Sequence, residues 1–205
     1  MIGIGITTNG RTNLLKELIN SIAEFTDMRD VKVYIADDSI ECKGVAYRKN
    51  ECLRSLRHCE HIFLLDDDIK ILQFGWVDFF INSGREHLLF MNRYTHQYLG
   101  TKGNIDVFGM CGGAFIYLTK EVLERVGAFN EKFGKYGFEH AEYSNRIYGK
   151  RNYYEMLKGT ENFIYCHDYS TENHLSSISE LEKSEWVKAN WTKYFNEPQI
   201  KYLPL

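Results

Sequence analysis

The chain has 205 residues, of which 44% are apolar, so it can form one domain with a sizeable core. The net charge is −3, which argues against a mainly electrostatic nucleic-acid binder with a basic face. No apolar run approaches the ~20 residues that span a bilayer, and the N-terminus lacks a basic region followed by an apolar signal core.

Strand and helix patterns alternate over the first third of the chain. Short apolar runs predict strands at residues 2–6, 31–36 and 62–65. Between them, apolar side chains at helical spacing predict helices at 14–22 and 44–56. This alternation predicts βαβ units, and therefore an α/β protein with a mostly parallel sheet.

Further elements follow towards the C-terminus. Helical patterns occur near 76–82 and 120–126, and an amphipathic helical pattern covers 179–195. A glycine-interrupted strand is expected at 108–118, and a last strand at 163–168.

The chain shows no internal repeat and no low-complexity linker, which predicts a single domain over residues 1–205.

The five cysteines are odd in number and scattered, and none forms a CxxC pair. This usage is typical of reduced thiols, so we expect a soluble cytoplasmic protein. The sequon Asn190-Trp191-Thr192 is then incidental.

Three carboxylates, Asp66-Asp67-Asp68, directly follow the predicted strand at 62–65. Crowded like charges raise each other's pKa values unless a cation neutralises them. Asp66 and Asp68 can converge on one divalent ion, since hard cations prefer oxygen ligands. The alternative is a solvated acidic turn.

A second acidic cluster, Asp37-Asp38-Ser39, ends the preceding strand. In open α/β sheets, ligands bind outside the carboxyl ends of the strands. Two strands ending in carboxylates therefore favour a nucleotide site at one edge of the sheet.

The order of these motifs resembles that of glycosyltransferases of the A-type fold, especially the family-2-like enzymes. The resemblance covers residues 2 to about 174. In the N-terminal half it rests on Ile6-Thr7-Thr8-Asn9-Gly10-Arg11, on Asp37-Asp38-Ser39, on Gly44-Val45-Ala46-Tyr47-Arg48-Lys49-Asn50 with one residue shifted, and on the DXD motif at Asp66-Asp67-Asp68.

Motifs in the C-terminal half extend the resemblance. They are Gly112-Gly113-Ala114-Phe115, the segment 126–133 and the segment 137–146. The sequence Glu139-His140-Ala141-Glu142 also looks like the Glu-Asn-x-Glu of the retaining polypeptide N-acetylgalactosaminyltransferases, and the C-terminal motifs are similar to those of galactosyltransferases.

The resemblance implies a single-domain, Rossmann-like sheet flanked by helices. It divides the domain into a nucleotide-binding half (1–70), an acceptor and catalytic half (71–178) and a C-terminal helix with its tail (179–205). It implies a hexosyltransferase-type enzyme that uses Mn²⁺ or Mg²⁺ to move a sugar from a nucleoside-diphosphate donor, expected to be UDP-linked, to an acceptor hydroxyl. The acceptor can be a glycan, a glycoprotein or a nucleic acid.

Site residues follow from the same resemblance. The metal ligands are expected to be Asp68, Asp66 and His167, and the catalytic candidates are Glu139, His140 and Glu142. The donor is expected to contact Thr7, Thr8, Asn9, Arg11, Asp37, Asp38, Arg48, Asp66, Asp67, Gly112 and Gly113. For Arg48 the alternative is an exposed helix residue, and for His167 a structural role.

His140 departs from the family pattern, because inverting members usually place an Asp there as the base. The base is therefore Glu139, His140 or Glu142, or is absent, and the stereochemistry stays open. An ordinary histidine pKa suits base work. A capping or packing histidine is the alternative.

Residues 168–179 are polar and follow the expected metal ligand. In related enzymes such a segment closes over the donor, which suggests a lid in which Tyr169 and His174 contact the diphosphate.

The acceptor pocket is expected in residues 75–108 and 175–205. The aromatic side chains there either stack on a sugar or belong to the core; they are Trp76, Tyr94, Tyr98, Trp186 and Trp191.

Two other functions are compatible with parts of the sequence. A DxD phosphohydrolase would usually carry its motif near the start of the chain, and it would leave Asp37-Asp38-Ser39 unexplained. A non-catalytic protein of the same fold is the other possibility, because fold does not imply function and His140 replaces the usual base.

Overall fold

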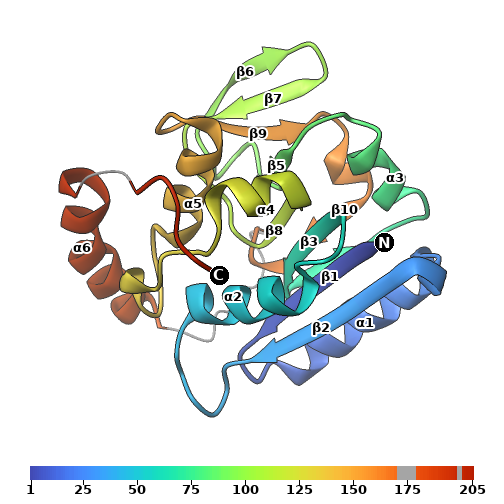
Figure 1. Cartoon of the computed structure of the whole chain (residues 1–205), viewed down its shortest axis with the longest axis horizontal. Coiled ribbons are helices and arrows are strands. Elements are labelled where there is room, and N and C mark those ends of the chain that lie inside the picture. The colour runs from blue at the N-terminus through green and yellow to red at the C-terminus, as the bar shows by residue number, and fades with distance from the viewer. Residues whose placement is uncertain (170–178, 198–199) are drawn as a thin grey trace.

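A five-stranded sheet forms the centre of the computed structural model, which describes residues 1–169, 179–197 and 200–205 (Figure 1). The strand order is β2 (Val31–Asp37), β1 (Ile2–Thr8), β3 (His61–Asp66), β8 (Phe115–Thr119) and β5 (His87–Leu89). β1 pairs in parallel with β2 and β3, whereas β8 is antiparallel to both β3 and β5. All strands but β8 therefore run in one direction, which confirms the predicted α/β class and mostly parallel sheet.

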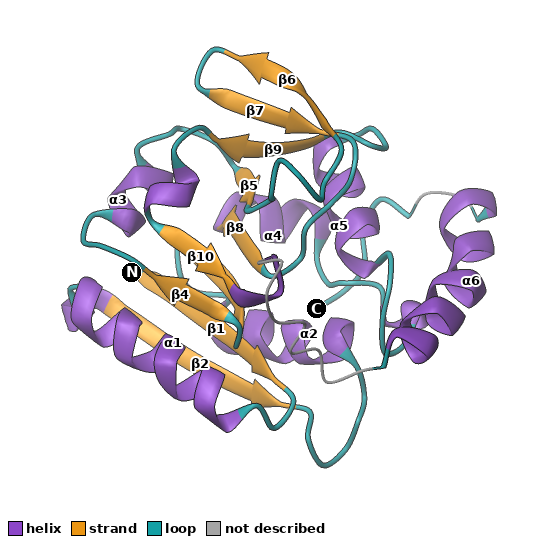
Figure 2. Cartoon of the chain, turned by 180° about the vertical axis from the view of Figure 1, so that it is seen from behind, coloured by secondary structure: helices purple, strands orange, loops and turns teal. Residues whose placement is uncertain are grey.

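Helices cover both faces of this sheet. α2 (Val45–Leu56) and α4 (Lys120–Val126) lie on the face towards the viewer in Figure 1. α1 (Thr12–Phe25) lies on the other face, in front in Figure 2. α5 (Glu139–Tyr148) follows α4 in the chain and contacts both α4 and α2.

Smaller elements complete the domain. β6 (Tyr98–Lys102), β7 (Ile105–Phe108) and β9 (Tyr154–Leu157) form a separate antiparallel sheet at the top of Figure 1. β4 (Ile69–Ile71) pairs with β10 (Ile164–Cys166). The remaining helices are α3 (Trp76–Ile81), α6 (Glu180–Asn196) and the 3₁₀ turns Met28–Asp30, Glu131–Phe133, Thr160–Asn162 and His167–Tyr169.

One hydrophobic core joins these elements into a single domain. Phe63 on β3 lies at its centre, with ring centroids 4.8 Å from Trp76, 5.1 Å from Tyr117 and 5.9 Å from Phe80. All four side chains are buried. Trp76 is thus a core residue, which was the alternative to stacking on a sugar.

The strand expected at 108–118 is divided between two sheets. β7 ends at Phe108, β8 begins at Phe115, and residues 109–114 form an irregular loop. Three of those six residues are glycine, which brings no side chain to pack in a strand. The loop instead lines a pocket, as described below.

α6 is fixed to the body of the protein by a buried asparagine. Its N-terminus carries a capping box, in which Ser179 and Glu182 satisfy each other's backbone N–H groups. Asn190 is fully buried, and its Nδ2 donates to the carbonyls of Phe133 (2.6 Å) and Tyr136 (2.9 Å). The sequon asparagine therefore faces the interior. Among the helices described, none has the length and apolar character to cross a bilayer.

Replacing Asn190 by alanine should loosen α6. Loss of its amide leaves the Phe133 and Tyr136 carbonyls buried without this donor, which costs roughly 1–3 kcal/mol of unfolding free energy. Chemical denaturation measures this loss. Thr192→Ala, at an exposed position on the same helix, also removes the sequon and should change stability by less than about 0.5 kcal/mol. Equal stabilities of the two variants would contradict this account.

Candidate functional site

Two adjoining pockets lie at the carboxyl ends of β1, β2 and β3. The larger has a volume of about 660 Å³ and the smaller about 230 Å³. Arg11, Val45 and Asp66 line both. This is the edge at which an open α/β sheet binds ligands.

The smaller pocket gathers most of the residues predicted to contact a donor. Those lining it are Thr7, Thr8, Asn9, Arg11, Asp38, Arg48, Asp66 and Asp67. Lys135 and Glu182, which the motifs did not indicate, complete the wall. Asp37 lines neither of these two pockets, and its Oδ1 instead accepts a hydrogen bond from the Ser39 N–H at 2.8 Å.

Asp38 and Arg48 form the floor of the smaller pocket as a pair. Asp38 Oδ1 accepts from Arg48 Nε at 2.9 Å, and its Oδ2 accepts from the Gly44 N–H at 2.8 Å. Arg48 also binds the carboxylates of Glu41 and Glu51 and is only 6% exposed. The exposed-helix alternative for Arg48 is therefore wrong. Glycine is required at 44, because φ is 99° and a Cβ would lie 2.4 Å from the Gly134 carbonyl oxygen.

Asp67 holds Arg11 between the two pockets. Its side chain is buried, forms an ion pair with Arg11 and accepts a hydrogen bond from Thr8 Oγ1 at 2.6 Å. Burial raises the pKa of Asp67, although Arg11 opposes that change. Arg11 Nη1 also lies 3.8 Å from Asp168 Oδ1, so this guanidinium links the ends of β3 and β10.

Asp66 is paired with a buried lysine. Its Oδ1 accepts from Thr7 Oγ1 at 2.6 Å and from Lys49 Nζ at 2.7 Å. Burial alone would raise the pKa of Asp66, but the Lys49 charge, His140 and the hydrogen bonds from Lys49 and Thr7 together lower it. Lys49 is fully buried and also donates to the Gly113 carbonyl at 3.1 Å. Sequence reasoning missed Lys49, although it belongs to the quoted motif beside Arg48.

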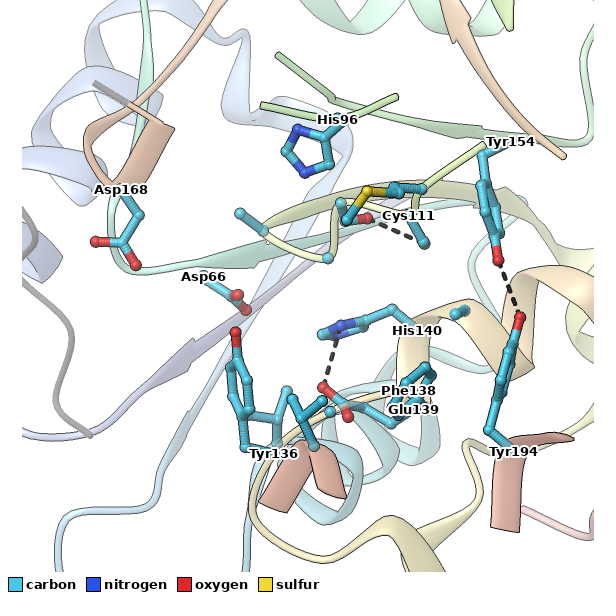
Figure 3. A pocket seen from close by; sticks show the side chains of 18 of the residues that line it. Asp66, His96, Cys111, Tyr136, Phe138, Glu139, His140, Tyr154, Asp168 and Tyr194 are labelled. Carbon is cyan, nitrogen blue, oxygen red and sulfur yellow. Dashed lines mark hydrogen bonds and ion pairs between the residues drawn. The ribbon is translucent and has the colours of Figure 1, made fainter. Parts of the chain in front are cut away.

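Asp68 is the carboxylate of the triplet with an unsatisfied oxygen. It is 2% exposed, its Oδ2 accepts from Cys166 Sγ at 3.6 Å, and its Oδ1 has no hydrogen-bond partner among the described residues. Burial, followed by the carboxylates of Asp66 and Asp168, raises the pKa of Asp68 to about 7. Asp168 lines the same pocket and turns its carboxylate towards it (Figure 3).

His167, which was expected to be a metal ligand, instead contacts helix α1. Its Nε2 lies 3.2 Å from Glu17 Oε2 on α1, and its ring packs on that of Tyr165 at 5.0 Å. It does not line the pocket with Asp66 and Asp68. The expected lid falls mostly outside the described residues, because 170–178, which include His174, are not among them.

The donors present fit a hard divalent cation. Within the described ranges, no group of three His, Cys, Asp or Glu side chains is arranged around one metal position. Mg²⁺, however, usually binds through one or two carboxylates, with water and substrate phosphates completing its shell. The buried, unsatisfied Asp68 Oδ1, in a pocket that Asp66 and Asp168 also line, meets that requirement.

Glu139 and His140 enter the larger pocket together at the start of α5. Their Oε1 and Nδ1 atoms lie 3.2 Å apart (Figure 3). Burial raises the pKa of Glu139 to about 7, whereas burial and the Lys49 charge lower the pKa of His140 to about 3. Phe138 precedes them in a left-handed conformation (φ 73°), which is a strained backbone of the kind found at functional sites.

Gly113 packs directly against His140. A Cβ at this position would lie 1.9 Å from His140 Nδ1, so only glycine allows the close approach. Gly112 and Gly113 both line the larger pocket.

Glu142 faces a different part of the molecule. Its Oε1 lies 2.9 Å from Arg146 Nε, and Arg146 in turn donates to the carbonyls of Val126 and Ala128. Glu142 lines neither of the two adjoining pockets. The structure thus brings Glu139 and His140 together and separates Glu142 from them.

Of the aromatic residues considered for an acceptor pocket, some line the larger pocket and others lie elsewhere. Trp191 lines the larger pocket, whereas Trp186 lies beside Gly134, where a Cβ would be 2.6 Å from its ring. Tyr94 is 98% exposed and Tyr98 belongs to β6; neither lines a pocket found among the described residues.

Substituting Glu139 by glutamine tests the buried carboxyl through stability. The folded-state pKa of about 7 lies above the ordinary 4.5, so the stabilisation from holding the proton is lost as pH rises through that interval. Between pH 5 and pH 8 without metal, wild type should lose about 2–3 kcal/mol relative to Glu139→Gln. Asp68 titrates in both proteins, so the difference isolates Glu139.

Urea denaturation at both pH values, with EDTA present, provides the measurement. Glu24→Gln removes a carboxylate from an exposed position on α1 and should follow the wild-type pH dependence. Parallel curves for Glu139→Gln and wild type would refute the assignment.

Comparison with known proteins places this fold. No protein-family profile matches the chain, and no curated protein sequence matches it. Among solved structures, S. aureus TarS has a TM-score of 0.59 at 14% identity, covering 95% of this chain and 43% of TarS. GalNAc-T7, solved with UDP, GalNAc and Mn²⁺, has a TM-score of 0.58 at 10% identity, covering 77% of this chain and 42% of that one.

A third similar structure is the mannosyltransferase PcManGT from Pyrobaculum calidifontis, solved with GDP-Man and Mn²⁺. Its TM-score is 0.56 at 15% identity, covering 78% of this chain and 55% of PcManGT. The chain therefore has the GT-A-type fold of glycosyltransferases, as its motifs predicted. It spans little more than half of PcManGT and less than half of the other two proteins.

Proposed function

We propose that this protein is a metal-dependent glycosyltransferase that moves a sugar from a nucleoside-diphosphate sugar to an acceptor hydroxyl. One observation carries the proposal. Two pockets join at an acidic sheet edge, one lined by the predicted donor residues and the other containing a buried carboxyl of raised pKa.

The smaller pocket suits the nucleoside of the donor. Its wall offers the side chains of Asn9 and Thr8, while Asp38 and Arg48 hold each other in place. The diphosphate then lies where the pockets meet, beside Arg11 and Asp66. TarS has been solved with UDP-GlcNAc and GalNAc-T7 with UDP, which favours a UDP-linked donor here.

Asp68 is proposed to hold Mn²⁺ or Mg²⁺, with Asp66 and Asp168 beside it. When bound, the ion supplies positive charge that stabilises the departing diphosphate. His167 remains a predicted ligand of this ion only if its side chain leaves Glu17. Lys49 keeps Asp66 ionised, and Asp67 fixes Arg11 at the diphosphate position.

Glu139 is proposed as the base rather than His140. General-base catalysis works best when the pKa of the base lies near the operating pH. The Glu139 value of about 7 meets this condition, whereas a histidine with a pKa of about 3 accepts protons poorly. His140 then positions Glu139 through the 3.2 Å contact between Nδ1 and Oε1.

Turnover assays test the reaction itself. With Mn²⁺, a panel of UDP-sugars and GDP-mannose for comparison, purified protein should release nucleoside diphosphate as the sugar passes to an added saccharide or to water, and EDTA should abolish the release. Inorganic phosphate released from a phosphomonoester would indicate the phosphohydrolase alternative. Donor binding without any release of nucleotide would indicate a non-catalytic protein.

Metal-linked donor binding should depend on Asp68. Asp68→Asn removes the negative charge from the oxygen ligand proposed for the ion, so it should weaken Mn²⁺-dependent UDP binding by tenfold or more. Isothermal titration calorimetry with UDP, with and without Mn²⁺, measures this effect. Asp30→Asn, at an exposed position, should leave the affinity unchanged. Wild-type affinity in Asp68→Asn would exclude this metal site.

The rate should depend on ionised Glu139. Because the base acts only when deprotonated, kcat/KM should rise with pH up to about 7 and then level off. Glu139→Gln should lower kcat by about 10²–10⁴-fold while UDP binding is retained. An unchanged pH–rate profile in this variant would show that another group accepts the proton.

A further inference from the structure

One face of α6 turns apolar side chains into the larger pocket. Val187, Trp191, Tyr194 and Phe195 recur at helical spacing, and all four line this pocket. Trp191 is 55% exposed and Phe195 is 36% exposed. An exposed apolar face within a pocket is typical of a ligand-binding surface.

These rings are held in position by their neighbours. Phe138 stacks on Tyr194 with centroids 4.6 Å apart, and Trp191 lies 4.3 Å from Phe195. Tyr194 is anchored by a 2.7 Å hydrogen bond from Asn145 Nδ2 to its hydroxyl. Phe138, Trp191, Tyr194 and Phe195 therefore form a preorganised surface, here called the aromatic platform.

The rest of the larger pocket is polar, with an excess of acidic groups. Planar polar side chains come from His96, Gln97 and Asn152. The lining also includes four carboxylates, of Asp66, Asp68, Glu139 and Asp168, whereas Arg11 is the single Lys or Arg among the described lining residues. Such a surface disfavours a polyanion and accommodates a neutral, hydroxyl-rich molecule.

The platform lies next to the proposed base. Phe138 directly precedes Glu139, and Glu139 and His140 lie between Asp66 and Tyr194 in the view of Figure 3. A ligand on the platform therefore lies across the pocket from the proposed diphosphate position. A volume of about 660 Å³ leaves room for a second sugar beside that of the donor.

We infer that the aromatic platform is the acceptor subsite and that the acceptor is a neutral saccharide, whose C–H face stacks on Trp191. This inference rests on the proposed function. Aromatic faces carry negative potential and attract the polarised C–H groups of a sugar ring. The ring hydroxyls are then within range of the polar wall, where amide and imidazole groups donate and accept hydrogen bonds.

In the proposed transfer, the hydroxyl oxygen of an acceptor bound there forms a bond to the anomeric carbon of the donor sugar. The bond from that carbon to the diphosphate oxygen breaks, and the diphosphate leaves with the electron pair. The hydroxyl proton passes to the Glu139 carboxylate.

Saturation-transfer NMR with defined probes tests the platform. The probes are methyl glycosides of glucose, galactose, mannose and N-acetylglucosamine, with a heparin disaccharide and a thymidine hexanucleotide as anionic comparisons, all with UDP and Mn²⁺ present. We expect wild type to bind at least one neutral glycoside through its ring C–H protons, in preference to either anion. Trp191→Ala should weaken this binding about tenfold, and Trp191→Phe should retain most of it.

Two further variants separate recognition from damage to the helix. Phe74→Ala removes an aromatic ring that is 66% exposed and lines neither the larger nor the smaller pocket, and it should bind like wild type. Asn152→Gly removes an amide from the polar wall without touching α6. Its φ of 54° suits glycine, so the backbone is kept, and binding should weaken several-fold.

The outcomes distinguish this inference from the proposed function. If no neutral glycoside binds, if an anionic probe binds better, or if Trp191→Ala binds like wild type, the inference is overturned even when UDP and Mn²⁺ bind normally. If UDP fails to bind while a glycoside still depends on Trp191, the transferase proposal falls and the platform stands as a sugar-binding site.

Discussion

The ion pair between Lys49 and Asp66 is the constraint on which the acidic sheet edge depends. A buried ammonium is stable only when charged and polar partners surround it, and Lys49 has the Asp66 carboxylate and the Gly113 carbonyl. These contacts join α2, the end of β3 and the glycine loop before β8. Since the loop also packs on His140, the pair fixes the distance between the carboxylate edge and the start of α5.

The same pair gives three adjacent aspartates three different roles. Lys49 compensates Asp66, and Arg11 compensates Asp67. Asp68 has no ion pair among the described residues, and its pKa is raised accordingly, because burial and two neighbouring carboxylates oppose its ionisation. The uncompensated charge is thereby confined to one position, which is where a cation gains the most electrostatic energy.

Sequence patterns predicted the parts of this protein that are local and strongly periodic. The strands at 2–6, 31–36 and 62–65 and the α/β class are confirmed, because all three apolar runs pair in parallel within one sheet. The strands β4, β5, β6, β7 and β9 escaped prediction, since strands of three to five residues carry little periodicity. The sequence also could not predict side-chain orientations that depend on partners far away in the chain. His167 lies beside Glu17, and Lys49 can be recognised as part of the site only from its contact with Asp66.

α6 contributes residues to both pockets. Glu182 at its start lines the smaller pocket, whereas Trp191 and Phe195 near its end line the larger one. Asn190 ties the middle of the helix to carbonyls of the segment that leads into Glu139. A tilt of α6 about Asn190 would therefore change both walls and the position of Glu139 together. Because one helix lines both pockets, the proposed donor and acceptor contacts depend on the same element.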